Sequence, residues 1–309
     1  MMSAAPATRL AAFRILSGAF ALGYLLVRLP HLVDITRFDA ARWDPPGILS
    51  VLQQPLAPGL AQVGLAAAIA AGVAFTAGWH HRISGPAFGL LLLGVLTYRN
   101  SWGHLFHTDN LLALHVLIVG LAPAADAWSL DARGAPRPAG VDVRYGWPLR
   151  LAALVTVLTY GVTGAAKLHY AGGDWWTGDT LLHQITFDNA RKKVLGDIYS
   201  PFAATLADHP ALARPMGPLT LLVELGAPLA LLGRRWATTW VAAAWTLHVG
   251  IAALMAIAFP YPLSLVAFAP LFHCERVIDV LLRHHGSSSR SPIRVAKTTA
   301  SRREWTSSL

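Results

Sequence analysis

Charge and cysteine are both scarce in this sequence. Lys, Arg, Asp and Glu make up 13% of its 309 residues, whereas a soluble domain has roughly 25%. The single cysteine, Cys274, excludes a disulfide within the chain and a zinc site built from several cysteines. No carboxylate–histidine pair has a recognisable zinc-site spacing either. We therefore expect no metal and a chain unlike a soluble domain.

In place of charge the sequence has long apolar runs. Hydrophobic residues make up 54% of the chain and the mean hydropathy is +0.47. The uncharged stretches are about 17–25 residues long, enough to cross a hydrocarbon layer about 30 Å thick. We predict an all-α, polytopic integral membrane helical bundle of about eight transmembrane helices. The predicted spans are residues 10–26, 57–78, 85–99, 107–125, 147–168, 216–233, 236–258 and 260–282.

The apolar runs define a predicted transmembrane domain at 9–283, after an N-terminal tail at 1–8. A basic, Ser- and Arg-rich tail at 284–309 has the composition of a disordered segment. The longest polar stretch, 169–215, is predicted to lie outside the membrane. Loops of this length usually have structure or function of their own, so we expect short interfacial helices there.

The formal net charge of +9 comes from positions typical of the cytoplasmic side of a membrane protein. Arg234 and Arg235 occupy one short loop, and further arginines lie in the loop at 126–146 and in the C-terminal tail. We expect a multi-pass protein of the cell membrane, in contact with the lipid bilayer, with both termini in the cytoplasm and no nucleic-acid partner. The basic run Arg191–Lys193 counts against this orientation, because it falls in the predicted outer loop.

Asn100, His104, His107 and His115 would share one face if a single helix ran through them. Such a face would point into the bundle or into a wet cavity rather than at lipid. The alternative is that residues 100–107 form a turn between two spans, with the histidines at the level of the headgroups.

Three further ionisable residues lie in predicted spans, namely Lys167, Glu224 and His248. Small residues such as Gly164 let other helices approach Lys167, and a desolvated lysine can act as a base. It can instead extend to the interface and have no other role. Glu224 marks a functional site or is a hydrogen-bonded group that joins helices. His248 is either reactive or a satisfied core histidine.

Trp175 and Trp176 follow Lys167 closely, after Asp174. Paired tryptophans after a span usually belong to the interfacial aromatic belt. They also suit the wall of a pocket for an apolar ligand. Both interpretations place them at the outer end of the predicted span that carries Lys167.

Five segments together resemble one known family. The first is Thr163-Gly-Ala-Ala-Lys-Leu168 with Asp174, Trp175 and Gly178. The others are Phe13-Arg14-Ile15; His107 with Leu111-Leu112, Pro123 and Ser129-Leu130-Asp131; Glu224 to Pro228; and Leu247-His248 through Pro270-Leu271-Phe272. In this order they resemble vitamin K-dependent gamma-carboxylase and its bacterial relatives, the HTTM (horizontally transferred transmembrane) domain proteins. The resemblance covers about residues 9–275.

The resemblance implies a membrane enzyme that uses a reduced quinone of the vitamin K type. In the carboxylase, reduced vitamin K adds dioxygen, and the resulting strong base removes a gamma proton from a glutamyl side chain before carbon dioxide is captured. The lysine that matches Lys167 is the general base on the hydroquinone, and the histidine that matches His107 assists it. We expect the remaining ligand-binding residues to be His104, Trp175, Trp176, Glu224 and His248.

Two departures from the carboxylase leave the activity open. Ala166 stands where the carboxylase has a second lysine, and no large extramembrane domain for a protein substrate is expected after the helices. The alternatives are a non-catalytic membrane protein, either a transporter or a helper or immunity subunit, and a purely structural scaffold. Arginine at position 167 would discriminate, because arginine does not give up its proton in proteins.

Overall fold

The computed structural model describes most of the chain and contains helices as its regular elements. The described residues are 4–103, 107–136 and 138–280. No β-strand occurs within these ranges, although an isolated antiparallel bridge pairs Ala5 with Asp142. The predicted all-α class is confirmed for this part of the chain.

The chain divides into two units, one ending at Glu275 and the other beginning at Arg276. The helices described below belong to the first unit. The tail predicted at 284–309 lies outside the described residues.

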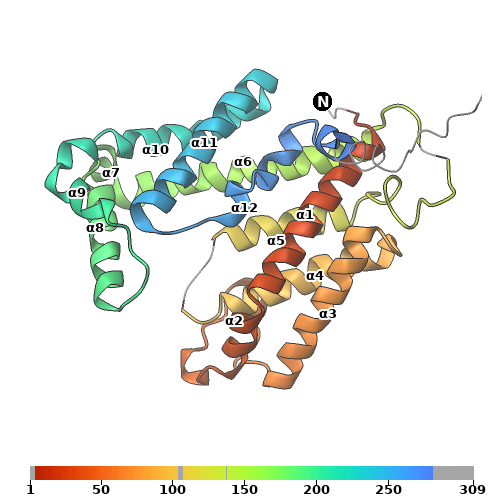
Figure 1. The fold of residues 1–309 in the computed structure, drawn as a ribbon, viewed down its shortest axis with the longest axis horizontal. Helices are drawn as coiled ribbons and strands as arrows, with labels where there is room; N and C mark the ends of the chain where they lie inside the picture. Colours follow the sequence, from red (N-terminus) through yellow and green to blue (C-terminus); the bar gives the residue numbers. More distant parts are fainter. Residues whose placement is uncertain (1–3, 104–106, 137, 281–309) are drawn as a thin grey trace, which may run out of the picture. The chain divides into compact units, whose positions relative to one another are not determined.

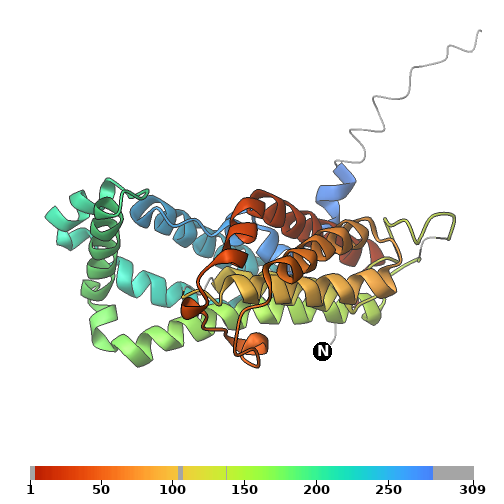
Figure 2. The same ribbon diagram turned by 90° about the horizontal axis from the view of Figure 1, so that it is seen from below.

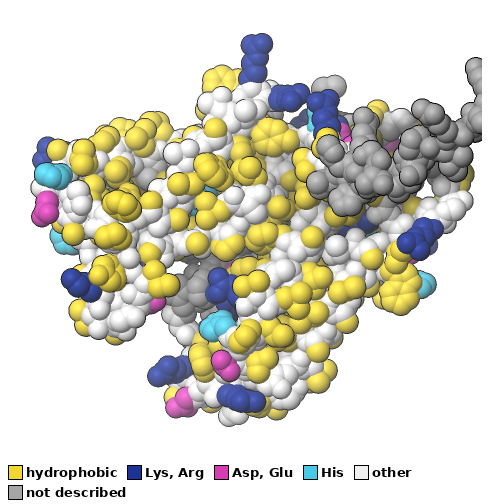
Figure 3. Space-filling model, viewed as in Figure 1, with side chains coloured by type: hydrophobic (Ala, Val, Ile, Leu, Met, Phe, Trp, Pro, Cys, Tyr) yellow, Lys and Arg dark blue, Asp and Glu magenta, His cyan; other side chains and the backbone are white. Residues whose placement is uncertain are grey.

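Four helices are long and apolar enough to cross a membrane: α1 (Ala7–Val27), α3 (Pro58–Ala77), α6 (Val143–Ala171) and α11 (Arg234–Met255). Each coincides with a predicted span. Their outer faces remain apolar, as Leu158 and Val162 of α6 show by their exposure. Hydrophobic side chains are also spread over the face seen in Figure 3. Exposed apolar surface on this scale suits contact with lipid or with another protein.

The other four predicted spans are shorter or broken, so a bundle of eight spans is not confirmed. The predicted spans at 85–99 and 107–125, the next two after α3, form α4 (His81–Arg99), which contains Pro86, and α5 (His107–Gly120). A helix of 14 residues is about 21 Å long, shorter than a hydrocarbon layer of about 30 Å.

Prolines break the two remaining runs. The predicted span at 216–233 is divided into α10 (Met216–Leu225) and the 3₁₀ helix η5 (Ala227–Leu231), with Pro228 near the break. The predicted span at 260–282 begins as α12 (Pro260–Leu263) and η6 (Val266–Leu271), a 3₁₀ helix that contains Pro270. Proline lacks the backbone N–H that a helix interior requires, and its ring clashes with the preceding turn.

The helices pack in a sequence of neighbours that can be followed in Figures 1 and 2. Helix α1 packs against α3 and α5, and α4 contacts the same two helices. Helix α5 in turn packs against α6, which carries α10, η5 and η6 along its length. The connection after α1 adds α2 (Leu29–Asp34) and the 3₁₀ helices η1 (Ile35–Arg37), η2 (Ala40–Arg42) and η3 (Gly47–Leu49).

Arg14 lies fully buried in α1 and holds this helix to the segment that follows α5. Its Nη1 donates to the carbonyl oxygens of Ala124 at 2.6 Å and Ala127 at 3.4 Å, and its Nη2 donates to that of Trp128 at 2.5 Å. Hydrogen bonds to a charged group contribute about 1.5–3 kcal/mol each. The arginine within the first predicted span is therefore a structural side chain that points into the protein.

The polar stretch at 169–215 is largely helical, as predicted. It contains α7 (Gly173–Trp176), α8 (Asp179–Val194), α9 (Phe202–Asp208) and the 3₁₀ helix η4 (Pro210–Leu212). Helix α6 extends to Ala171, so the polar stretch begins slightly later than predicted. In Figure 1, α8 and α9 lie beside the C-terminal end of α11, and α7 connects them to the end of α6.

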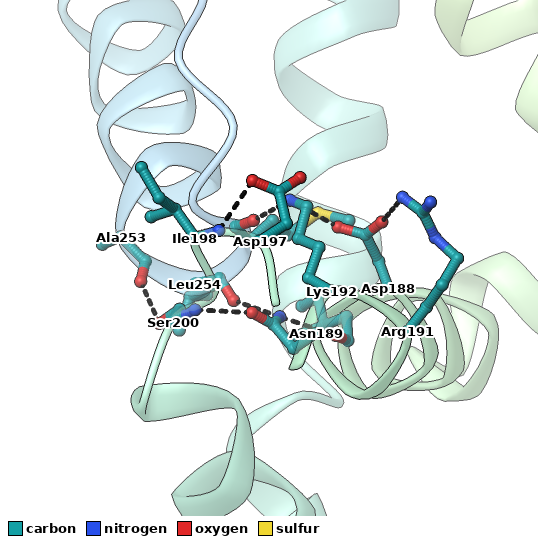
Figure 4. Close-up of polar contacts among 11 residues, drawn as sticks. Asp188, Asn189, Arg191, Lys192, Asp197, Ile198, Ser200, Ala253 and Leu254 are labelled. Atoms are coloured by element: carbon teal, nitrogen blue, oxygen red, sulfur yellow. Dashed lines mark hydrogen bonds and ion pairs between the residues drawn. The ribbon is translucent and has the colours of Figure 1, made fainter. Parts of the chain in front are cut away.

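Side chains of this polar segment cap the last carbonyl groups of α11 (Figure 4). Ser200 Oγ donates to the oxygen of Ala253 at 2.5 Å, and Asn189 Nδ2 to that of Leu254 at 2.9 Å. Lys192 Nζ donates to the oxygen of Met255 at 2.6 Å. The final carbonyls of a helix have no partner within the helix, so these bonds satisfy them. One member of the basic run Arg191–Lys193 therefore has a structural role.

Candidate functional site

Three helices bring together the three ionisable residues predicted from separate spans. Lys167 comes from α6, Glu224 from α10 and His248 from α11. Lys167 Nζ donates to Glu224 Oε1 at 2.5 Å. The Glu224 side chain is 6% exposed and that of Lys167 is 22% exposed. The carboxylate is therefore held inside the protein by a lysine that reaches it from a more open position.

A close helix crossing makes this pair possible. A Cβ atom placed on Gly164 would lie 2.9 Å from Glu224 Cβ and 3.0 Å from Leu225 Cδ2. Only a residue without a side chain lets α10 approach α6 so closely. A Cβ atom placed on Gly161, one turn earlier in α6, would have no neighbouring atom within 4 Å. The small residues before Lys167 thus include one that forms the contact and one that faces open space.

Trp175 completes the surroundings of Lys167. The ammonium nitrogen lies 4.6 Å from the centroid of the Trp175 ring, within the range of a cation–π interaction. Trp175 is buried, and its Nε1 donates to Thr220 Oγ1 at 2.9 Å. Trp176 is 55% exposed. The predicted tryptophan pair is therefore divided, with one ring against the lysine and the other on the surface.

His248 is paired with a tyrosine that sequence reasoning missed. The hydroxyl of Tyr160 lies 2.6 Å from His248 Nε2, and both residues are buried. Tyr160 also packs against Trp240 and Phe268 in the core between α6 and α11. Phe259 covers His248 on another side, with ring centroids 5.3 Å apart. The histidine is oriented by these neighbours.

These groups line one cavity of about 180 Å³. Its polar lining includes Lys167, Glu224, His248 and Tyr160. The remaining lining residues are Leu111, Thr159, Thr163, Leu247, Ile251, Phe259 and Pro262. A small group of polar atoms within mainly apolar walls is typical of a site for a small organic molecule.

A larger cavity of about 400 Å³ shares two lining residues, Leu247 and Ile251, with the first. Its walls come from α8, α10 and α11, and threonines supply their only polar side chains among the described residues. The shared residues place an apolar space directly beside the ionisable cluster.

Two buried polar atoms of the cluster have no hydrogen-bond partner in the part of the chain that the structure describes. They are Glu224 Oε2 and His248 Nδ1. Buried polar atoms are nearly always hydrogen-bonded, because an unpartnered one costs about 1–3 kcal/mol. Both residues line the same cavity, so a ligand with polar atoms there has two groups to bind.

The predicted histidine face is interrupted. Helix α4 ends at Arg99 and α5 begins at His107, so no single helix carries Asn100 and His115, as the alternative interpretation expected. His104 lies outside the described residues, as does the side chain of His107. Leu111, one turn after His107, does line the cavity.

His115 is a core residue. Its Nδ1 lies 2.7 Å from the hydroxyl of Tyr261, and its Nε2 lies 3.1 Å from the carbonyl oxygen of Ala152 and from Thr156 Oγ1. It is fully buried and does not line the cavity of Lys167. Both of its ring nitrogens are therefore satisfied within the protein.

A signal for some of the missed residues was present in the sequence. Tyr160 and Thr163 precede Lys167 by seven and four residues, which puts all three on one face of α6. Phe259 gave no such signal, because it lies in the non-helical connection after α11. Within the described residues, no three His, Cys, Asp or Glu side chains form a group that could hold a metal ion.

Comparison of the chain with protein-family models, with curated proteins and with solved structures found no match.

Proposed function

We propose that this chain is a multi-pass membrane enzyme that acts with a reduced quinone, as its resemblance to the gamma-carboxylase and HTTM family implies. The observation that carries the proposal is the Lys167–Glu224 pair, 2.5 Å apart in a largely apolar cavity that also holds His248 and Tyr160. Four helices of membrane-spanning length support the location. The shorter helices α4, α5 and α10 would complete the bundle inside the bilayer.

The residues present fit a reduced quinone. Its ring would lie between the apolar walls of the 180 Å³ cavity, and an isoprenoid chain would suit the adjoining apolar cavity. Glu224 Oε2 and His248 Nδ1 are available to the ring oxygens, since neither has a partner among the described residues. When bound, such a molecule supplies acidic hydroxyl groups and electrons for reaction with dioxygen.

Lys167 would act as the general base. A lysine must be uncharged before it can accept a proton. Glu224 Oε1, 2.5 Å from Lys167 Nζ, is the group placed to take that proton from the lysine. The amine then accepts the proton of a hydroxyl group held in the cavity. Trp175, whose ring centroid lies 4.6 Å from the Lys167 nitrogen, would cover one side of the lysine.

Tyr160 is a positioning residue in this scheme. If its hydroxyl donates to His248 Nε2, then Nδ1 of the histidine carries the hydrogen and donates into the cavity. The 2.6 Å bond fixes both the tautomer and the direction of the ring. His248 would thereby hold a ring oxygen in place while Lys167 removes the proton.

The test is oxygen consumption by the purified protein with a reduced naphthoquinone. We expect Lys167→Ala and Lys167→Arg each to lower the rate by about 100-fold or more, the usual contribution of a general base. Lys167→Arg keeps a cation beside Glu224 but cannot accept a proton. Lys193→Ala, an exposed lysine of α8, is the matched control and should keep the wild-type rate.

Full activity of Lys167→Arg would contradict the role of Lys167 as a base. No oxygen consumption by the wild type would contradict the enzymatic proposal, and the non-catalytic alternative, a transporter or helper subunit, would take its place.

A further inference from the structure

A third cavity, of about 200 Å³, lies between α3, α4 and the connection that joins α1 to α3. Two glycines line it, Gly64 of α3 and Gly94 of α4, and a Cβ atom placed on either would have no neighbouring atom within 4 Å. Nearer the turn between the two helices, a Cβ atom on Gly72 would lie 2.8 Å from Phe88 Cε2. The helices are therefore in close contact at one end and leave a hollow toward the other.

The walls of this cavity are apolar and reach the outer surface of the protein. Leu60 and Leu90 line it and are 59% and 60% exposed. Among the described lining residues only Thr36 and Tyr98 have polar side chains, and none is charged. The cavity shares no lining residue with either of the cavities near Lys167. It is thus a separate site that suits an apolar group.

Tyr98 supplies the one polar group of the lining that is not already bound. Its side chain is buried, with the residue 6% exposed, and its hydroxyl has no hydrogen-bond partner within the described ranges. Thr36 Oγ1, by contrast, donates to the carbonyl oxygen of Val33 at 2.7 Å and accepts from Gln62 Nε2 at 3.2 Å. Buried hydroxyl groups are nearly always hydrogen-bonded. Tyr98 is therefore suited to bind a hydrogen-bond acceptor carried by an apolar ligand.

The polar end of the cavity lies where helices end. Tyr98 belongs to the last turn of α4, and α3 begins at the same end because the two helices pack side by side after a short turn (Figure 1). The rings of Trp43 and Trp102 lie 5.1 Å and 5.7 Å from that of Tyr98, measured between centroids. Clustered Trp and Tyr side chains are typical of the membrane–water interface. Gly94 and Leu90 continue the cavity from this level into the length of α4.

We propose that this cavity binds an acyl chain of a membrane glycerolipid, whose ester carbonyl accepts a hydrogen bond from the Tyr98 hydroxyl. The order of groups matches such a lipid, with the hydrogen-bond donor at the interface and apolar walls below it. Because no charged side chain lines the cavity, the headgroup stays outside and the ester is the polar group that is recognised. This site shares the membrane location of the proposed function but does not depend on its quinone chemistry.

The experiment measures lipid binding to the full-length protein, delipidated in detergent, by native mass spectrometry. The two probes are a diacyl phosphatidylethanolamine and its dialkyl ether analogue with chains of the same length, which lacks the ester carbonyls. The variants are Tyr98→Phe, Gly64→Leu and Gly94→Leu. Gly23→Leu in α1 is the matched control, because its Cβ atom also meets open space but Gly23 does not line the cavity. Thermal unfolding of each variant shows that it is folded.

We expect the wild type to bind the ester lipid about 5-fold more tightly than the ether lipid, the effect of one neutral hydrogen bond. Tyr98→Phe should bind the two lipids equally. Gly64→Leu and Gly94→Leu should each weaken the binding of both lipids by about 10-fold, because a leucine side chain takes the space of at least two methylene groups of the acyl chain. Gly23→Leu should bind as the wild type does.

An ester preference that persists in Tyr98→Phe would overturn the proposal, and so would the absence of that preference in the wild type. Wild-type affinity in both Gly64→Leu and Gly94→Leu would show that no acyl chain enters the cavity. The comparison of the wild type with Tyr98→Phe decides the question even where a leucine variant fails to fold, because it leaves the size of the ring and the shape of the cavity unchanged.

Discussion

At the scale of single residues, the Lys167–Glu224 pair is asymmetric. Glu224 is the more buried partner, and one of its oxygens depends on Lys167 for its only described hydrogen bond. Removing one partner of a buried pair leaves the other charge without compensation, which costs more than the pair itself contributes. We therefore expect the lysine to contribute to stability as well as to the proposed chemistry.

A double-mutant cycle separates the two roles of Lys167. We expect Lys167→Ala to lower the free energy of unfolding by about 3 kcal/mol. Adding Glu224→Gln should restore part of that loss, because a neutral amide no longer needs a counterion. Thermal unfolding of the wild type, both single variants and the double variant measures the coupling. Additive effects would show that the two side chains do not interact in the folded protein.

At the scale of helices, the contact of α10 with α6 depends on one glycine. Gly164→Ala places a methyl group where Glu224 and Leu225 lie, whereas Gly161→Ala places one in open space. We expect Gly164→Ala to destabilise the protein by about 1–3 kcal/mol and to weaken ligand binding at Lys167. Gly161→Ala should be neutral or slightly stabilising, because alanine favours helix more than glycine. Equal effects of the two substitutions would contradict this crossing.

The docking of α8 on α11 is expected to depend on pH through Asp188. Partial burial acts to raise the pKa of its carboxyl, but hydrogen bonds from Lys192 and Arg191 outweigh it and lower that pKa below the ordinary value. The ion pairs measure 2.8 Å and 2.9 Å. A lowered pKa in the folded state adds stability that is fully present above the unfolded value of about 3.9. This stability is lost as the pH falls through the folded pKa.

The corresponding measurement is the unfolding midpoint between neutral pH and about pH 3. The wild type should lose more stability over this range than Asp188→Asn, which has no titrating group at this position. Asp208→Asn is the control, since Asp208 makes no ion pair with a described residue. An identical pH dependence for the wild type and Asp188→Asn would exclude a stabilising role of the carboxylate.

At the scale of the whole molecule, the apolar runs predicted four long helices to within four residues at each end. A long apolar run is enough to predict the position of such a helix. The expected spans that contain Pro228 and Pro270 are divided, whereas Pro86 and Pro148, near the starts of α4 and α6, leave those helices intact. The mean hydropathy of a run does not detect such a break. Proline is compatible with an apolar segment, but it lacks the backbone N–H that a helix needs.

The candidate site could be predicted only in part. Lys167, Glu224 and His248 attract attention because ionisable groups in apolar segments are costly. Tyr160 does not, since a tyrosine in an apolar run needs no explanation until its hydroxyl is seen beside His248. The convergence of α6, α10 and α11 depends on contacts between residues far apart in sequence, which the local pattern does not encode.

The orientation of the chain in the membrane gives a whole-molecule prediction. Single cysteines are introduced by Asp197→Cys and Arg235→Cys in a Cys274→Ala background. In intact cells, a membrane-impermeant maleimide should label Asp197→Cys, in the predicted outer segment. It should reach Arg235→Cys only after permeabilisation, because the positive-inside rule places that loop in the cytoplasm. The reverse pattern would invert the proposed topology.

The measurement that tests the central claim most directly is a titration of the purified protein with a reduced naphthoquinone. The wild type should bind it saturably, and Lys167→Ala, Glu224→Gln and His248→Ala should each bind at least about 10-fold more weakly, as expected when a hydrogen bond in a buried site is lost. Arg235→Gln, which changes a residue that does not line the cavity, should bind normally. No saturable binding, or equal binding by all the variants, would contradict the assignment of a quinone site to this cluster.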